Sequence, residues 1–283
     1  MKKQNPALSI ITICYNIKDE IERTCKSIVN QTWQDFEWIV VDGGSTDGTV
    51  DVLKEYADRI NILISEKDGG LYNAMNKGIK KARGEWLNFL NGGDEYATYD
   101  ALEKVFKDKT YSVNILQAEE ERFDPKGIKS YIWQYKEPIN KLTFLKYSMA
   151  HQSAFYRRTL FKKYGLYDES YRFCADTELN LRLVSAGEQV ELLDFIVGRF
   201  WLNGVTMDPK NKRARKAEHI RFNYVYYTPQ ELADFEIDRQ EAIHRKLEQK
   251  RAKKKKSKNI PCVPYKKSYK LFGIIPLLSI EDK

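Results

Sequence analysis

Apolar, strand-like segments alternate with helical segments through the first 90 residues, and this alternation most constrains the fold. The strand-like segments lie at residues 8–14, 36–41, 60–64 and 86–90, and the helical ones at residues 19–30, 50–56 and 71–82. Strands that are apolar on both sides are typical of sheets buried on both faces. The pattern therefore predicts an α/β protein with a mostly parallel central sheet and flanking helices.

The stretch VVDGGSTDGT, residues 40–49, is the most specific turn in this alternation. Asp42 stands at the end of the second expected strand, and Gly43 and Gly44 permit a sharp turn. The three polar residues that follow can cap the next helix. A strand, a polar turn and a helix in this order typically form one edge of a ligand crevice.

Polar residues follow the carboxyl ends of all four expected strands. They are Tyr15 and Asn16, residues 42–47, residues 67–70 and residues 91–94. Because parallel strands end at the same edge of a sheet, these loops should converge on one rim, where open α/β sheets bind ligands. Neither a GxGxxG fingerprint nor a GxxxxGK[ST] loop occurs, which counts against a dehydrogenase and a P-loop enzyme.

The alternation weakens after residue 100 and resumes later in the chain. Residues 154–156 are strand-like, and residues 159–164 form a short predicted helix. Asp176 then precedes an amphipathic helix that should end near Gly187. This second region is predicted to complete the same domain.

Residues 207–258 are predicted to form a helical appendage, followed by a basic and apolar tail at residues 259–283. Thr228 and Glu231 form a capping box around Pro229, so a helix should run from Pro229 into a cluster of lysines. These boundaries leave residues 1–206 as the main domain.

The formal net charge is +8, and much of the excess lies in the basic run at residues 250–258. Such an excess suits nucleic acid, anionic lipid or phosphorylated ligands, although a solvated helix end has the same composition. No recognisable nucleic-acid motif accompanies the run, so we do not expect a nucleic-acid partner.

The cysteines and the apolar runs indicate a cytoplasmic protein. No CxxC pair occurs, which argues against a zinc cluster or disulfide framework and fits a reducing compartment. The apolar run near the N-terminus breaks at Tyr15 without a small-residue cleavage site, so we interpret it as a strand rather than a signal peptide. The apolar stretch at residues 271–280 is too short to span a bilayer.

Four motifs follow one another between residues 7 and 205: LSIITICYN, EWIVVDGGSTDGT, SEKDGGLYNAMNKGIKKARGEWLNFLNGGD and ADTELNLRL. Together they resemble the family 2 glycosyltransferases, which have the GT-A fold, a Rossmann-like sheet with flanking helices. The resemblance implies that residues 1–206 are the catalytic domain, with the nucleotide-sugar half at about 1–100 and the acceptor half at about 101–206. The family transfers a sugar from a nucleotide donor with inversion at the anomeric carbon. The chain looks most like bacterial enzymes that build capsule, O-antigen or exopolysaccharide.

The resemblance implies a UDP-sugar site in the loops after the first strands. Asp42 would accept a hydrogen bond from uracil N3, and Tyr15 would pack on the base. The other implied nucleotide-sugar residues are Asn16, Gly43, Lys67, Asp68, Asn91, Gly93 and His151. From the residues alone, Asp42 can instead cap its own turn.

The NGGD segment, residues 91–94, stands where the family carries an acidic DxD-type metal motif. Mn²⁺ or Mg²⁺ that bridges two phosphates prefers carboxylate oxygens, and Asp94 keeps that charge, so it is the implied metal ligand. Asn91 can offer a carbonyl oxygen, and Gly93 leaves room for the ribose. The departure from DxD motivates an alternative, a catalytically weak nucleotide-sugar-binding module.

Inverting transfer needs one base to take the proton of the acceptor hydroxyl. By the resemblance, Asp176 is this base, and the dipole of the following helix favours its charged form. Aspartate is also a common N-cap, and Glu178 is a nearby competitor for the catalytic role. Trp201 and Gly204 are candidates for an acceptor platform.

The segment SYKLFGIIPLLSI in the tail resembles the ending of many lipopolysaccharide and capsule glycosyltransferases. Lysines near anionic lipid contribute about 1 kcal/mol each, and an aromatic-aliphatic segment can lie at the headgroup boundary. We therefore expect a peripheral enzyme on the inner face of the cell membrane, with a glycan or lipid-linked saccharide as acceptor. The alternative is that the tail folds back onto the catalytic domain.

Overall fold

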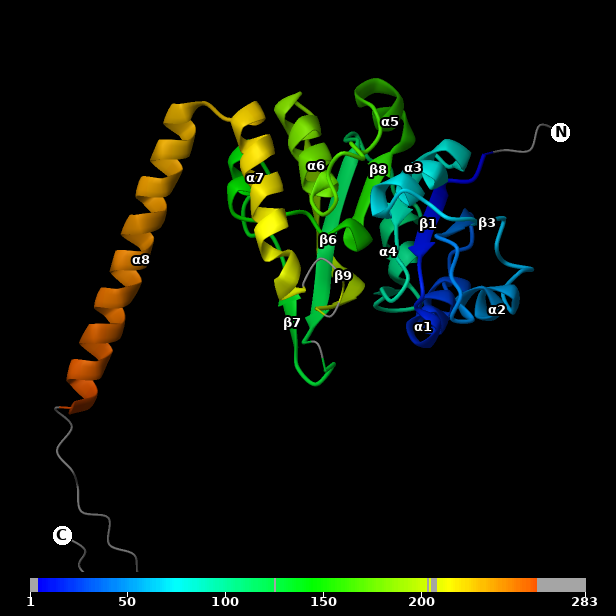
Figure 1. Cartoon of the computed structure of the whole chain (residues 1–283), viewed down its shortest axis with the longest axis horizontal. Helices are drawn as coiled ribbons and strands as arrows, with labels where there is room; N and C mark the ends of the chain where they lie inside the picture. The colour runs from blue at the N-terminus through cyan, green and yellow to red at the C-terminus, as the bar shows by residue number, and fades with distance from the viewer. Residues whose placement is uncertain (1–4, 125, 203, 205–207, 259–283) are drawn as a thin grey trace, which may run out of the picture. The chain divides into compact units, whose positions relative to one another are not determined.

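The computed structural model describes residues 5–124, 126–202, 204 and 208–258. The chain divides into two compact units, Met1–Tyr227 and Thr228–Lys283. The first unit is an α/β domain built on one sheet, and the second contains the helix α8 (Pro229–Lys258) (Figure 1). The tail predicted to bind membrane lies outside the described residues.

A nine-stranded sheet forms the centre of the first unit, in the order β3-β2-β1-β4-β8-β6-β9-β5, with β7 paired to β6. The strands are β1 (Leu8–Cys14), β2 (Phe36–Asp42), β3 (Ile62–Ser65), β4 (Trp86–Phe89), β5 (Glu95–Tyr96), β6 (Ile115–Phe123), β7 (Ser130–Trp133), β8 (Ala154–Arg157) and β9 (Val190–Trp201). The first four strands are parallel neighbours, as predicted, whereas β8 runs antiparallel to both β4 and β6. This α/β architecture confirms the predicted fold class.

Helices flank this sheet (Figure 1). They are α1 (Lys18–Val29), α2 (Thr49–Lys54), α3 (Leu71–Lys81), α4 (Ala101–Phe106), α5 (Arg158–Tyr164), α6 (Ala175–Ser185) and α7 (Lys212–Tyr226), with short 3₁₀ turns η1 (Lys141–Leu145), η2 (His151–Ser153) and η4 (Pro209–Asn211). The predicted helices of the first 90 residues are confirmed, with ends displaced by one or two residues because helix ends are set by local capping.

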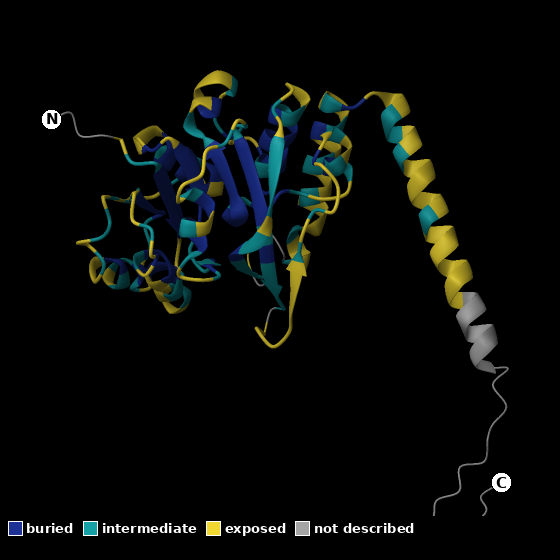
Figure 2. Ribbon diagram, turned by 180° about the vertical axis from the view of Figure 1, so that it is seen from behind, coloured by how far each residue is buried: buried dark blue, intermediate teal, exposed yellow. Residues whose placement is uncertain are grey.

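The two faces of the sheet have separate apolar layers. Leu8 and Ile10 of β1 belong to a core cluster shared with α1, α2 and α4. On the opposite face α3 approaches β1 so closely that a Cβ atom on Gly78 would lie 2.5 Å from Ile11 Cγ2. Figure 2 shows the resulting buried strands in dark blue. The two layers fix the sheet rigidly, so its edge holds the loops in place.

The C-terminal helices fall into different units. α7 packs on α6 and belongs to the first unit, whereas the sequence predicts it as part of one appendage with α8. The predicted capping box of α8 is present, because Thr228 N donates to Glu231 Oε2 at 2.8 Å and Glu231 N donates to Thr228 Oγ1 at 3.2 Å. Among the described residues no helix is both long and apolar enough to cross a membrane.

Candidate active site

The loops after β1 and β2 are fastened to each other by hydrogen bonds. Asn16 N donates to Ser45 Oγ at 2.8 Å, and Thr46 N donates back to Asn16 Oδ1 at 2.9 Å. Asn16 adopts a left-handed backbone, with φ of 48°. Its amide therefore fixes the rim of the site and leaves Tyr15 beside it, 62% exposed.

Asp42 organises the turn after β2. Its Oδ2 accepts hydrogen bonds from Gly44 N at 3.1 Å, Ser45 N at 3.0 Å and Ser65 Oγ at 2.7 Å. Its Oδ1 accepts from the hydroxyl of Ser45, and the residue is fully buried. This geometry contradicts the uracil contact predicted for Asp42, because neither carboxylate oxygen reaches the surface. The turn-capping alternative describes the residue correctly.

A second carboxylate, that of Asp68, lies where the rim is open. A Cβ atom on Gly43 would be 2.8 Å from Asp68 Oδ2 and 3.3 Å from Tyr15 Cδ2, so the missing side chain of Gly43 lets these two groups approach. Asp68 Oδ1 accepts from Gly70 N at 2.8 Å, which orients the carboxylate. The backbone of Lys67 passes close to Gly44 in the same way. The structure thus brings Tyr15, Gly43 and Asp68 together, as the sequence predicted.

The NGGD loop after β4 is held from below by α1. Thr24 Oγ1 donates to Asp94 O at 2.6 Å, and Arg23 Nε donates to Gly93 O at 2.6 Å. The guanidinium of Arg23 also lies 4.1 Å from the ring centroid of Trp201. Arg23 and Thr24 were not found by sequence reasoning, because their contacts with the loop span about 70 residues of chain. Trp201 consequently lies beside the predicted metal motif.

His151 joins the metal motif to the predicted base. Its Nε2 lies 3.8 Å from Asp94 Oδ2, and its Nδ1 lies 3.9 Å from Asp176 Oδ2. Asn88 of β4 positions the turn that carries His151, since Asn88 Nδ2 donates to Ala154 O at 2.8 Å. Three residues that are distant in sequence therefore form a line, Asp94–His151–Asp176, across the carboxyl end of β4.

The charges along this line depend on one another. Burial opposes the charged imidazole, but the hydrogen-bonding and Coulombic effects of Asp176 and Asp94 outweigh it and raise the pKa of His151 to about 10. Burial raises the pKa of Asp94, although His151 and Arg23 act in the opposite direction. The histidine therefore carries a positive charge between two acidic side chains at neutral pH.

Asp176 lies in the first turn of α6 and is not its N-cap, which is Cys174. Its Oδ1 accepts from the hydroxyl of Tyr72 at 3.0 Å and from Thr177 N at 2.8 Å, so Oδ2 faces His151. Tyr72 belongs to α3 and thus connects the donor half to the base. Sequence reasoning missed it, because no local pattern marks a tyrosine on a helix as a partner of Asp176.

Glu178, the competitor of Asp176, is committed elsewhere. It is buried and forms an ion pair with Arg182, with an N–O distance of 2.7 Å. It also accepts from the hydroxyl of Tyr226 at 2.6 Å, which ties α6 to α7. These contacts assign Glu178 to packing between helices and leave Asp176 as the carboxylate that faces the site.

A glutamate of α7 holds the backbone that leads into the helix of Asp176. Cys174, the N-cap, makes no side-chain capping bond itself. Instead the Glu218 carboxylate accepts from the backbone amides of Arg172, Phe173 and Cys174, at 2.8, 2.9 and 3.0 Å. One remote residue therefore satisfies three backbone donors of the segment that leads into α6. This positioning residue also escaped sequence reasoning.

The oxygen ligands near Asp94 suit a hard divalent cation that takes its remaining ligands from the substrate. Asn91 Oδ1 is buried and has no hydrogen-bond partner, while Asn91 Nδ2 lies 2.9 Å from His151 Nε2. An amide oxygen beside a carboxylate offers the oxygen ligands that Mg²⁺ and Mn²⁺ prefer. No group of three or more acidic, histidine or cysteine ligands occurs among the described residues, so phosphate oxygens and water would have to complete the shell.

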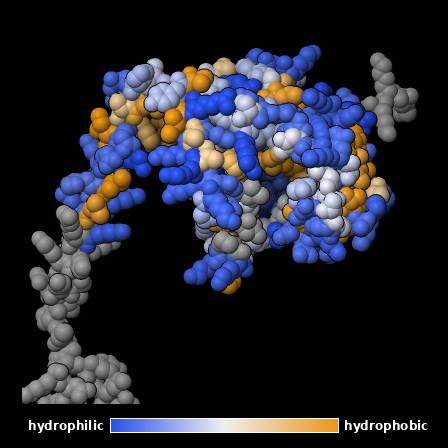
Figure 3. Space-filling model, viewed as in Figure 1, coloured by the Kyte–Doolittle hydropathy of each residue, from blue (hydrophilic) through white to orange (hydrophobic). Residues whose placement is uncertain are grey.

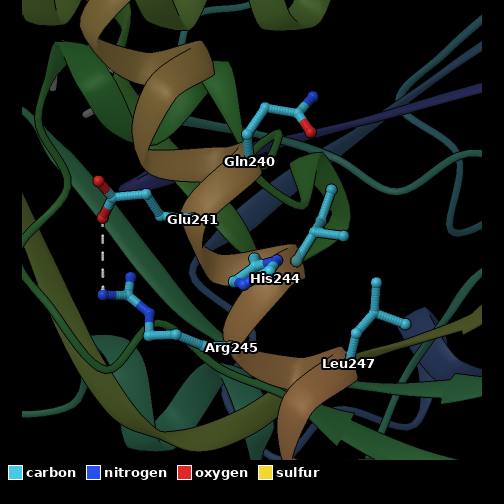
Figure 4. Close-up of a pocket in the computed structure, with 6 residues that line it drawn as sticks. Gln240, Glu241, His244, Arg245 and Leu247 are labelled. Carbon is cyan, nitrogen blue, oxygen red and sulfur yellow. Dashed lines mark ion pairs between the residues drawn. The ribbon is translucent and has the colours of Figure 1, made fainter.

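Two hollows among the described residues lie away from this rim. One of about 620 Å³ is formed by residues of α8 alone, with Glu241 and Arg245 paired along the helix at 3.7 Å (Figure 4). Another of about 400 Å³ lies at the opposite, N-terminal edge of β1 and β4, beside Trp33 and Trp86. Neither contains the line from Asp94 to Asp176. The candidate site is therefore defined by converging side chains at the carboxyl edge.

Solved structures define the fold class of this arrangement. TarS residues 1–349 of S. aureus, in complex with UDP, matches with a TM-score of 0.58 at 22% identity, covering 69% of this chain and 60% of that one. The mannosyltransferase PcManGT from Pyrobaculum calidifontis, in complex with GDP-Man and Mn²⁺, matches with a TM-score of 0.58 at 17% identity, covering 77% of this chain and 63% of that one. The described domain therefore has the GT-A glycosyltransferase fold.

Sequence comparison then gives the family. Residues 9–165 match the family model described as glycosyl transferase family 2. A PGL/p-HBAD biosynthesis glycosyltransferase of Mycobacterium bovis (strain BCG / Pasteur 1173P2) is 34% identical over 191 residues, which cover 64% of this chain and 70% of that protein. The chain belongs to glycosyl transferase family 2 and is a glycosyltransferase. The resemblance drawn from its motifs is confirmed.

Proposed function

We propose that this enzyme transfers a sugar from a UDP-sugar to a glycan or lipid-linked saccharide, with inversion at the anomeric carbon, during synthesis of a bacterial surface polysaccharide. The observation that carries the proposal is the line Asp94–His151–Asp176 at the edge that holds the donor loops. The curated relative named for PGL/p-HBAD biosynthesis supports a role in glycan assembly.

The donor base fits between Tyr15 and Asp68. The exposed ring of Tyr15 offers a stacking face, and Asp68 Oδ2 beside Gly43 offers an acceptor for uracil N3–H. Asp68, rather than Asp42, is therefore the proposed partner of uracil N3–H, because the carboxylate of Asp42 is enclosed. Lys67 and Asn16 stand at the same rim, and the UDP complex of TarS supports this choice of nucleotide.

The diphosphate belongs beside the NGGD loop. Asp94 and Asn91 would hold a divalent cation, Mn²⁺ or Mg²⁺, which would neutralise charge on the leaving diphosphate. His151 adds a positive charge at the same place, and Gly93 leaves room for the ribose. The Mn²⁺ complex of PcManGT supports a metal, while the single carboxylate of the motif limits what the protein itself contributes.

Asp176 acts as the general base. It takes the proton of the acceptor hydroxyl while that oxygen attacks the anomeric carbon, and the bond from that carbon to UDP breaks on the opposite face. The hydroxyl of Tyr72 and the amide of Thr177 hold one carboxylate oxygen, so the other is directed toward His151 and the site. A base fixed in this way loses little entropy when it reacts.

A screen of nucleotide sugars tests the proposal. UDP-sugars should stabilise the protein against heat and should be hydrolysed slowly without acceptor, more so with manganese. A signal from GDP- or dTDP-sugars alone would overturn the uracil assignment. Stabilisation by UDP-sugars without any turnover would favour a nucleotide-sugar-binding module, the alternative that the weakened metal motif suggests.

We also propose that the enzyme is a cytoplasmic, peripheral membrane protein that docks through residues 259–283. The lysines and apolar residues of that segment support this location. Removal of residues 259–283 should reduce co-sedimentation with anionic liposomes. Unchanged binding would mean that the tail is not the anchor.

A further inference from the structure

The helix α7 has an inner face that is fully engaged with the domain. Phe222 is completely buried, and Glu218 directs its carboxylate to the start of α6. Tyr226 binds Glu178 from the same side. Glu218 is the only acidic residue in the sequence of α7, and it lies on this inner face.

The outer face of α7 is apolar along its centre and basic at its sides. Ala217, Ile220 and Tyr224 are spaced by three and four residues, so they form one stripe. Ile220 is 46% exposed, Tyr224 is 77% exposed and the neighbouring Val225 is 69% exposed. Figure 3 shows hydrophobic side chains in orange beside hydrophilic ones in blue in this region.

Cations flank this stripe. Arg213, Lys216 and Arg221 are exposed. At 100° per residue Lys216 and Arg221 fall on opposite sides of the stripe, and Arg213 lies at its N-terminal end. Arg221 also lies over the ring of Tyr171 at 4.1 Å, which fixes its place on the surface. Arg221 also forms an ion pair with Asp168, with an N–O distance of 3.6 Å, so the positive charge of this face rests mainly on Arg213 and Lys216.

We propose that the outer face of α7 is a membrane-docking surface that binds anionic phospholipid headgroups. A helix with an apolar centre and basic sides lies in the plane of the interface, with its aromatic and aliphatic residues at the acyl boundary. The long stems of lysine and arginine let their charges reach the headgroups. This contact is additional to the tail and does not depend on the identity of the sugar.

A second copy of the chain fits this surface poorly. Two such faces would bring two positively charged surfaces together, and like charges across an interface are repulsive. An anionic bilayer instead gains from each cation and accepts Tyr224 and Val225. Charge complementarity therefore selects lipid over self-association.

The test places an environment-sensitive fluorophore on the stripe of the full-length chain. Ala217→Cys is labelled in a Cys262→Ser background, because Cys14, Cys25 and Cys174 are buried. Vesicles with about one third phosphatidylglycerol should shift its emission to the blue, and pure phosphatidylcholine vesicles should not. The matched control is the same label at Lys81→Cys, an exposed position at the end of α3, which should not respond.

Charge reversal sharpens the test. Arg213→Glu with Lys216→Glu should weaken vesicle partitioning at least roughly 30-fold, since each cation near the surface contributes about 1 kcal/mol and each new glutamate is repelled by anionic lipid. Lys109→Glu with Lys136→Glu gives the same change in net charge at exposed sites elsewhere and should have a much smaller effect. The proposal is wrong if the chain binds vesicles while the label at 217 stays unchanged. It is also wrong if the label shifts without vesicles as the protein concentration rises, or shifts equally with an oligonucleotide.

Discussion

The donor rim and the catalytic corner of this glycosyltransferase are built in different ways. At the donor rim, loops after consecutive parallel strands fasten to each other, as Asn16 does with Ser45 and Thr46. At the catalytic corner, Asp176 is held by Tyr72 from α3, by His151 from η2 and, through its helix, by Glu218 from α7. The rim rests on local turns, whereas the corner rests on contacts between distant segments.

This difference implies that the two halves respond differently to substitution. A change at the rim alters the shape of one loop and should affect donor binding. A change at a support of Asp176 moves the base relative to the anomeric carbon and should affect turnover, because catalysis is sensitive to small errors in position. Changes at the rim should therefore appear in the KM for the UDP-sugar, and changes at the corner should appear in kcat.

Glu218→Ala is expected to give the largest effect among the supports of the corner. It leaves three backbone amides at the start of α6 without their partner, so kcat should fall roughly 100-fold with little change in the KM for the UDP-sugar. Glu218→Gln keeps one acceptor oxygen and should recover part of the loss. Glu231→Ala removes a comparable cap from α8 and should leave kcat unchanged. Equal losses in the Glu218 and Glu231 variants would refute the positioning role.

Gly43→Ala tests the donor rim. The new methyl group would meet Asp68 Oδ2 at 2.8 Å and Tyr15 Cδ2 at 3.3 Å, so the KM for the UDP-sugar should rise about tenfold while kcat changes little. Gly69→Ala is the control, because its nearest contact would be an ordinary 3.5 Å to Asn73 Cγ. A fall in kcat alone would show that Gly43 does not shape the site that holds the nucleobase. Steady-state kinetics with varied donor gives both constants.

Tyr72→Phe removes one hydrogen bond from Asp176 and leaves the buried ring in place. A hydrogen bond to a charged carboxylate is worth about 1.5 kcal/mol or more, which corresponds to roughly a tenfold fall in kcat. Tyr111→Phe removes a hydroxyl that donates to Val105 O, away from the site, and serves as a control for general destabilisation. If the two variants lost activity equally, the contact with Asp176 would have no special role.

His151 predicts a smaller effect, on the pH dependence of stability. Its pKa is raised to about 10 in the folded chain from an ordinary value of 6.5. The folded state therefore holds its proton more tightly, so this contribution is complete below pH 6.5 and is lost as the pH rises through 10. Metal-free protein should lose less stability between pH 7 and 10 in His151→Gln than in the wild type. His244→Gln, on α8, should behave as the wild type does; identical profiles for all three proteins would contradict the raised pKa.

The sequence predicts the rim better than the corner for physical reasons. β1 to β4 are apolar and separated by turn residues, so their order and their carboxyl edge follow from local patterns. β6 was missed because its sequence, ILQAEEERF, contains charged residues, and Glu120 is buried only by virtue of Arg122 and Gln152. Pairing with neighbouring strands overrides the local composition there.

The candidate residues also differ in how far the sequence reveals them. Asp94, His151 and Asp176 were named from motifs, and the structure brings them together. Asp42 was given a ligand role because a motif does not reveal that every oxygen of a carboxylate is already bonded. Glu218 gave no signal, because its partners lie more than 40 residues away and are backbone amides that any sequence carries.

The most direct test compares the wild type with Asp176→Asn for transfer from a UDP-sugar, together with UDP binding by calorimetry. The account predicts at least a thousandfold loss of turnover in the variant, with UDP affinity within about twofold of the wild type, because the base is lost while the donor rim stays intact. Turnover by Asp176→Asn close to that of the wild type would contradict the assignment of the base and, with it, the proposed mechanism.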